Sequence, residues 1–409
     1  MARTVAELPK GSRITDYISL GVIAKTFPLE SVHRVLRETG RTSKRQRDLP
    51  AHVMVYYAIG LALYMQVSCR EVLRCMLEGI RWLMLPSVKI KTASRGGIAR
   101  ARERLGSEPM VLLHDELVAP IAVRGSERTT KGAWYRRWCL VSIDGSTLDI
   151  ADTKENETFF GRPSSSRGTS AFPQIRLVSL VENGTHILFG TRMGGYSTGE
   201  VTLAKEVLGF LKEGMLCLAD RNFYSYTLWK QARGTGADLV WRVKKNQKLL
   251  CLKRFRDGSY LSKIYASDKD RRHDRGIEVR VVEYALEGVP DAEPIYRLIT
   301  TIIDPTEAPA KELAALYQER WEIETAFDEF KTHLRGANIV LRSKQPDLVI
   351  QEFYGFMLAH FAIRGIMHEA ALRADEDPDQ LSFVHAVRVV RRKLPLFVAI
   401  PPSGEKNVS

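Results

Sequence analysis

The chain has 409 residues, of which 44% are hydrophobic, so it can form two or three domains with buried cores, and a disordered protein is excluded. Its 61 Lys and Arg residues against 48 Asp and Glu give a net charge of +13, which favours a polyanionic partner such as nucleic acid or an acidic membrane. The five cysteines include no CxxC pair, so the sequence predicts neither a zinc site nor a disulfide framework and fits a reducing cytosol.

Residues 1–125 have apolar side chains at helical spacing over most of their length, so this region is predicted to be helical. Within it, residues 51–69 carry no Asp, Glu, Lys or Arg and are long enough to raise the question of a membrane span. His52, Gln66 and Ser68 dilute the run, and we expect a buried helix. Two basic stretches, RTSKRQR and SRGGIARARERLG, are each compatible with a solvated surface or with contacts to phosphate.

From residue 137 the pattern changes to strands separated by helices, which indicates an α/β fold. The run RWCLVSIDGSTLDI is predicted as a strand that ends at Asp144, and QIRLVSLVE and THILFGTRM as a hairpin joined by Asn183-Gly184. A helix follows in TGEVTLAKEVLGFLKEG, and then a short buried strand, MLCLAD, ends at Asp220. Further strands are expected in DLVWRVKKN and over residues 295–303.

Residues 241–292 are rich in Lys and Arg, among them Lys244 and Lys245, and aromatic residues such as Trp241 lie between them. Short alternating runs predict β structure, so this region is expected to be an insertion into the α/β unit. Basic residues interleaved with aromatics suit a surface that follows a nucleic-acid backbone and stacks on bases. An ordinary β subdomain with aromatic core residues explains the same aromatics.

The stretch YQERWEIETAFDEFK contains Tyr317, Arg320, Glu324 and Lys331, spaced three, four and seven residues apart. At about 100° per residue, an α-helix would place these four side chains within an arc of roughly 60° beside an apolar stripe. A carboxylate flanked by Arg, Lys and a phenol suits a site that holds a metal and binds phosphate. A solvated helix face is the alternative. Residues 346–373 are then predicted to form a helix packed within the protein.

Three carboxylates occupy related places: Asp144 and Asp220 at predicted strand ends, and Glu324 on the helix after the last strand. Acids at adjacent strand ends converge, and their mutual repulsion is relieved when Mg²⁺ binds between them. Two such metals can activate an attacking oxygen and stabilise a leaving one during displacement at phosphorus. The set predicts phosphodiester cleavage or transfer, although each Asp alone is equally compatible with a turn or capping role.

The aspartates in SIDGS and ADRNF, together with the helix motif Y-x2-R-x3-E-x6-K, resemble the DDE transposases of bacterial insertion sequences, specifically the insertion-sequence-four group. The resemblance implies a ribonuclease-H-like mixed-sheet core at residues 132–240 plus 293–345, interrupted by the β-rich insertion at 241–292. It also implies a helical DNA-binding region at 1–125 and a helical C-terminal region at 346–409.

The resemblance also implies a function and a set of site residues. The enzyme would bind the terminal inverted repeats of its element, cleave the ends and join them to target DNA. Mg²⁺ is the expected cofactor, with Mn²⁺ able to substitute. Asp144, Asp220 and Glu324 would be the catalytic metal ligands. The expected DNA contacts are Tyr317, Arg320, Lys331, Arg221, Trp241, Lys244 and Lys245.

Relatives in this group work as dimers, so a homodimer is expected, in the bacterial cytoplasm and with no membrane partner. Two alternatives use the same residues. A DNA endonuclease would cut with the same metals but join nothing, and a non-catalytic DNA-binding protein descended from a transposase would bind without cutting.

Overall fold

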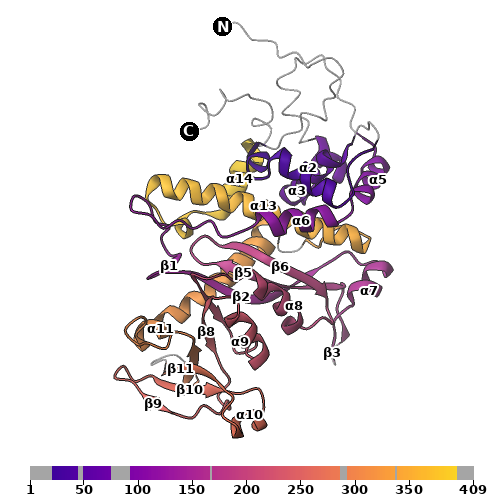
Figure 1. Ribbon diagram of the computed structural model, residues 1–409. Helices are drawn as coiled ribbons and strands as arrows, with labels where there is room; N and C mark the ends of the chain where they lie inside the picture. Colours follow the sequence, from indigo (N-terminus) through magenta and orange to yellow (C-terminus); the bar gives the residue numbers. More distant parts are fainter. Residues whose placement is uncertain are drawn as a thin grey trace. The chain divides into compact units, whose positions relative to one another are not determined.

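The computed structural model describes residues 21–44, 49–74, 93–165, 168–285, 293–336 and 339–393 (Figure 1). The chain forms two compact units, one of residues 1–119, 148–174 and 327–409, the other of residues 120–147 and 175–326. The four-part division expected from the sequence stays a prediction. In the structure, the expected insertion and the core strands belong to the same compact unit.

The first unit is helical and is organised around α13 (Pro346–Ala374), the helix predicted at 346–373. It packs against α3 (Ala51–Leu63), and Gly355 makes a close approach possible, since a methyl group there would lie 2.5 Å from the Ala58 carbonyl oxygen. Almost every residue of α3 is buried, which confirms the predicted buried helix. Among the residues that the structure describes, no helix is long and apolar enough to cross a membrane.

The other elements of the first unit are short. They are α1 (Gly21–Thr26), α2 (Leu29–Glu38), α5 (Arg95–Leu105), α6 (Glu108–Leu117), α7 (Lys154–Phe160), β3 (Ser164–Ser165), β4 (Gly168–Thr169), the π-helical η4 (Glu329–Leu334), the 3₁₀ turn η5 (Pro378–Gln380) and α14 (Phe383–Lys393).

The two basic stretches of the N-terminal region have different outcomes. Part of the first, residues 45–48, lies outside the described residues. The second forms α5, and its Arg102 is buried, with Nε donating to Gln351 Oε1 at 2.8 Å and Nη2 to Ser343 Oγ at 2.9 Å. Arg102 therefore joins helices within the unit, whereas Arg95, Arg100 and Arg104 of the same helix are exposed.

The second unit is built on one mixed sheet with the strand order β6-β5-β2-β7-β8-β12-β11-β10-β9. Asn183-Gly184 lies between antiparallel β5 and β6, as the hairpin signal predicted, while β2, β7 and β8 run parallel. The first five strands in this order confirm the predicted ribonuclease-H-like mixed-sheet core. Their bounds are β2 (Trp138–Asp149), β5 (Gln174–Glu182), β6 (Ile187–Gly195), β7 (Met215–Ala219) and β8 (Asp238–Arg242), and β1 (Trp134–Tyr135) pairs with β2.

The insertion is β-rich, as predicted, and it extends the core sheet. Strand β12 (Tyr296–Thr300), which was predicted as part of the core, pairs antiparallel with β8 on one side and with β11 (Ile277–Tyr284) of the insertion on the other. Beyond β11 come β10 (Tyr260–Ile264) and β9 (Lys253–Arg254), with the short α10 (Asp268–Arg272) between β10 and β11. Residues 286–292 lie outside the described residues.

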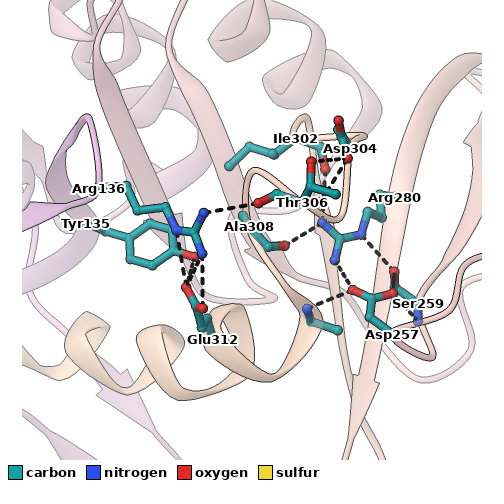
Figure 2. Close-up of polar contacts among 11 residues, drawn as sticks. Tyr135, Arg136, Asp257, Ser259, Arg280, Ile302, Asp304, Thr306, Ala308 and Glu312 are labelled. Atoms are coloured by element: carbon teal, nitrogen blue, oxygen red, sulfur yellow. Dashed lines mark hydrogen bonds and ion pairs between the residues drawn. The ribbon is translucent and has the colours of Figure 1, made fainter.

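Helices of the second unit pack against this sheet. Two follow core strands: α8 (Glu200–Val207), which continues as the 3₁₀ turn η2 (Leu208–Phe210), and α9 (Tyr226–Arg233). After β12 come α11 (Ala310–Leu316) and the 3₁₀ segment η3 (Tyr317–Trp321), and the chain continues into α12 (Glu322–Asp328), whose last two residues belong to the first unit. Leu313 of α11 and Tyr317 of η3 belong to a buried cluster with Trp138, Leu140, Leu216, Leu218, Val240 and Leu298 of the strands. The solvent side of α11 is also held, because Glu312 accepts from Tyr135 Oη at 2.7 Å and Arg136 Nη2 at 2.9 Å (Figure 2).

Candidate active site

The register of two parallel strands brings Asp144 and Asp220 together. The last paired residues of β2 and β7 are Ile143 and Ala219, and the two aspartates follow directly. Neighbouring strands lie about 4.8 Å apart, so the two aspartates lie close together just beyond the last paired residues of β2 and β7. One expectation needs correction: Asp144 does not end its strand, because β2 continues to Asp149, and it is β7 that stops.

The Asp144 carboxylate is largely shielded from solvent, and each of its two oxygens has a polar partner. Its Oδ1 accepts from the Gly145 amide at 2.7 Å, and its Oδ2 lies 3.2 Å from Arg320 Nη1. Burial raises the pKa of Asp144 to about 6; the Gly145 bond and Arg320 oppose that shift, whereas Asp220 and Glu200 add to it. Negative charge thus accumulates around Asp144, and the guanidinium of Arg320, in direct contact with it, offsets part of that charge.

The segment carrying the sequence motif is not one α-helix. Tyr317–Trp321 is 3₁₀-helical, Glu322–Asp328 is α-helical and Glu329–Leu334 is π-helical, so a uniform 100° per residue does not apply. The prediction that the four motif residues share one face of a single α-helix is therefore wrong.

Tyr317 and Arg320 point into the unit. Both are 6% exposed, and the Tyr317 hydroxyl donates to the carbonyl oxygen of Ala219 at 3.1 Å. Burial raises the pKa of the Tyr317 phenol well above its usual range, so it stays a neutral donor. Tyr317 fixes the residue before Asp220, and Arg320 fixes Asp144.

Glu324 and Lys331 lie farther along the motif. Glu324 is exposed on α12, and in the described part of the chain the ligand atoms of Asp144, Asp220 and Glu324 do not all lie within 4.8 Å of one another. Lys331 is in η4 of the other unit, where burial, and then Arg335, lower the pKa of its ammonium. A buried ion pair between Glu329 and Arg364 of α13, with Nε to Oε2 at 2.8 Å, anchors that π-helical segment.

The remaining predicted DNA contacts differ in exposure. Lys244 and Lys245 are exposed after β8, and Arg221, also exposed, pairs with Glu293 at 2.5 Å. Trp241 is 1% exposed and packs edge-to-face on Trp229 with ring centroids 5.4 Å apart. It is a core residue of β8, so the expectation that it contacts DNA is not retained.

Two residues with a place in this site escaped sequence reasoning. Trp321 is 52% exposed, and the guanidinium of Arg320 lies 4.4 Å from the centroid of its ring. The sequence signal was the aromatic directly after the arginine of the motif. Glu200, at the start of α8, lies beside Gly145, and nothing in the spacing of the sequence indicates this approach.

Comparison with known proteins shows the family to which the chain belongs. The family described as "Transposase DDE domain" matches residues 138–361, a span of more than half the chain that includes Asp144, Asp220 and Glu324. The chain belongs to the DDE transposase family. The family described as "Insertion element 4 transposase N-terminal" matches residues 17–115 of this transposase.

Two curated relatives come from Escherichia coli strain K12. The transposase is 29% identical to "Transposase InsG for insertion sequence element IS4" over 379 residues, 89% of this chain and 80% of that protein. It is 26% identical to "Putative transposase InsZ" over 224 residues, 54% of this chain and 71% of that protein. Among solved structures it is similar to a piggyBac transposase synaptic complex with hairpin DNA, with 12% identity, coverage of 95% and 84%, and a TM-score of 0.47.

These matches confirm the resemblance to the insertion-sequence-four group and the prediction of a DNA transposase. The protein is an enzyme that acts on DNA, and its DDE domain implies the use of a divalent metal.

Proposed function

We propose that this transposase binds the terminal inverted repeats of its insertion sequence, cleaves the ends and joins them to target DNA, with Mg²⁺ as its metal and Mn²⁺ able to substitute. The observation that carries the proposal is the β2–β7 register, which sets Asp144 beside Asp220, with Arg320 on one carboxylate and Tyr317 on the adjoining backbone. A homodimer in the bacterial cytoplasm is part of the proposal.

The donor set fits a hard divalent cation. Asp144, Asp220 and Glu324 offer only carboxylate oxygens, the ligands that Mg²⁺ prefers, and no thiol or imidazole is among them. By analogy with two-metal sites in other phosphoryl-transfer enzymes, these three residues would hold the metal. When bound, the metal supplies a more acidic attacking hydroxyl and a stabilised leaving oxygen in phosphodiester transfer.

Other side chains of the protein position the carboxylates and contact the DNA. Arg320 keeps the Asp144 carboxylate in place and offsets part of its charge, and Tyr317 holds the end of β7 and so orients Asp220. Trp321 offers an exposed ring for stacking on a base or sugar. Lys331, Arg221, Lys244 and Lys245 are proposed to contact DNA phosphates.

One experiment separates the proposal from its two alternatives. Purified transposase is incubated with Mg²⁺, a target plasmid and either uncut or pre-cut DNA from the borders of its element. We expect cleaved ends from the first substrate and joined products from both. Cleavage without joined products would indicate an endonuclease, and binding without cleavage would indicate a non-catalytic descendant.

The lysines after β8 allow a quantitative test of DNA contact. Replacing Lys244 and Lys245 together with Gln should weaken binding to element ends and reduce the slope of log affinity against log salt by about 2, because each lost phosphate contact removes about one released counterion. Fluorescence anisotropy between about 50 and 200 mM salt measures both. Lys205 and Lys212 are exposed elsewhere in the same unit, so their double Gln variant is a control with the same charge change. If the two double variants had the same slope of log affinity against log salt, Lys244 and Lys245 would not be part of the DNA-binding surface.

A further inference from the structure

Arg242 continues the row of charged residues that begins with the two aspartates. Aligned residues of the parallel strands β2, β7 and β8 pair with one another as far as Ala219 of the central strand. The next residues of the three strands are Asp144, Asp220 and Arg242. Trp241 is buried, and successive side chains of a strand alternate between its faces, so Arg242 lies on the face of β8 opposite to that tryptophan. The third parallel strand therefore places a guanidinium next to the pair of acids.

The guanidinium groups of Arg242 and Arg221 meet at one carboxylate oxygen. Arg242 Nη2 lies 2.9 Å from Glu293 Oε1, and Arg221 Nη1 lies 2.5 Å from the same atom. Two cations against one acid leave a net positive charge beside Asp220, which Arg221 directly follows. The Arg221 side chain is 44% exposed, so a ligand can reach it from solvent. Guanidinium groups bind the oxygens of phosphates in the same way as those of carboxylates.

Arg242 has support that does not depend on Glu293. Its guanidinium lies 4.5 Å from the centroid of the Tyr296 ring, and that ring stacks on Tyr284 with centroids 5.3 Å apart. The Glu293 amide donates to Tyr296 Oη at 3.3 Å, so the backbone of Glu293 is held separately from its carboxylate. A change in the Glu293 side chain alone would therefore uncover both guanidinium groups and leave Arg242 on its aromatic support.

We propose that Arg221 and Arg242 form a binding site for a backbone phosphate of DNA, and that Glu293 occupies this site until DNA displaces its carboxylate. The proposal rests on the function proposed above and adds Arg242 to the residues that contact DNA. A phosphodiester carries the same single negative charge as a carboxylate and likewise offers two oxygens to a guanidinium. The exposed Lys244 follows two residues after Arg242, so the site lies between the aspartates and a lysine already proposed to contact phosphate.

The direct test removes the competing carboxylate. Binding of the full-length protein to a labelled duplex of the element end is measured by fluorescence anisotropy. Glu293→Gln should tighten binding by about three- to tenfold, because the two arginines are then free to bind phosphate in a larger fraction of the molecules. Glu283→Gln is the matched control, since it removes the same charge in the same unit from a pair with Arg297 at 2.7 Å. Equal affinities of the two glutamine variants would overturn the proposal.

A second measurement tests whether the effect passes through the arginines. Arg221→Gln and Arg242→Gln together should weaken binding and reduce the slope of log affinity against log salt by about 2. In that background, Glu293→Gln should tighten binding no more than Glu283→Gln does. The same gain from Glu293→Gln in both backgrounds would contradict the proposal. Circular dichroism checks folding, and Arg221→Gln alone, at an exposed position, provides the test if the double variant does not fold.

The same titrations separate this inference from the function on which it rests. If the unaltered protein binds element ends no more tightly than unrelated DNA of the same length, the proposed function fails. If it prefers element ends and Glu293→Gln behaves like Glu283→Gln, only the phosphate site of Arg221 and Arg242 fails.

Discussion

Replacing Asp144 with Asn should reduce DNA cleavage by at least about a thousandfold while leaving binding to element ends within a few-fold. Asparagine keeps the size of the side chain and an oxygen to accept from the Gly145 amide, but it removes the negative charge beside Asp220. Loss of several kcal/mol of charge stabilisation at the reacting phosphate corresponds to a rate loss of that order. Single-turnover cleavage of labelled end DNA measures the rate, and a gel-shift assay on the same DNA measures binding.

The matched control is Asp304→Asn. Asp304 lies in the loop after β12, and its Oδ1 accepts from the Thr306 amide at 2.8 Å, a bond that asparagine retains. The two variants change the net charge equally, so their difference isolates the site. A folded Asp144→Asn protein that cleaves at the rate of Asp304→Asn would contradict the assignment of Asp144 to the active site. Circular dichroism of both variants establishes that they are folded.

The strands that place Asp144 and Asp220 were predictable because their signals are local. A buried strand is an apolar run, and Asn183-Gly184 marks the hairpin between β5 and β6. Parallel pairing of β2 and β7 then makes residues after matched positions converge, whichever strand continues. The α/β class and the strands beside the two aspartates therefore followed from patterns within a few residues of each position, whereas the ribonuclease-H-like core was implied by the resemblance to the family.

What could not be predicted depends on partners distant in the sequence. The change from 3₁₀ to α to π within one motif accompanies Tyr317 bonding to β7 and Glu329 pairing with Arg364. Tertiary contacts of this kind override helical periodicity. Burial of Trp241 is a similar case, because an aromatic between basic residues looks the same whether it faces Trp229 in the core or faces DNA. Only the packed structure distinguishes the two.

Replacing Arg280 with Met should lower the free energy of unfolding by about 1–3 kcal/mol, the usual cost of leaving buried hydrogen-bond acceptors without their donor. Arg280 is fully buried in β11, and its guanidinium donates to Asp257 Oδ2 at 2.6 Å, Ser259 Oγ at 2.8 Å and the Ala308 carbonyl at 2.7 Å (Figure 2). Methionine fills similar space but satisfies none of these acceptors. Urea unfolding followed by tryptophan fluorescence measures the loss.

The same substitution should also slow cleavage, because the Arg280 network holds the helix that leads into the active site. Asp257 Oδ2 accepts from the Ala310 amide at 2.9 Å, and so caps α11, whose own N-cap residue, Pro309, supplies no side-chain bond. Helix α11 runs directly into η3, which carries Tyr317 and Arg320. The insertion thereby helps to orient the residues that contact Asp144 and the residue before Asp220.

Arg297 provides the comparison that tests this argument. It lies on the adjacent strand β12 and pairs with Glu283 at 2.7 Å, but both side chains are partly exposed, so Arg297→Met should cost only about 1 kcal/mol or less. Replacing Arg280 with Met and Asp257 with Leu together should recover part of the lost stability, since the carboxylate that has lost its guanidinium partner is then removed as well. Cleavage should not recover, because Asp257→Leu itself removes the cap of α11. If activity returned together with stability, the network would be needed for folding alone.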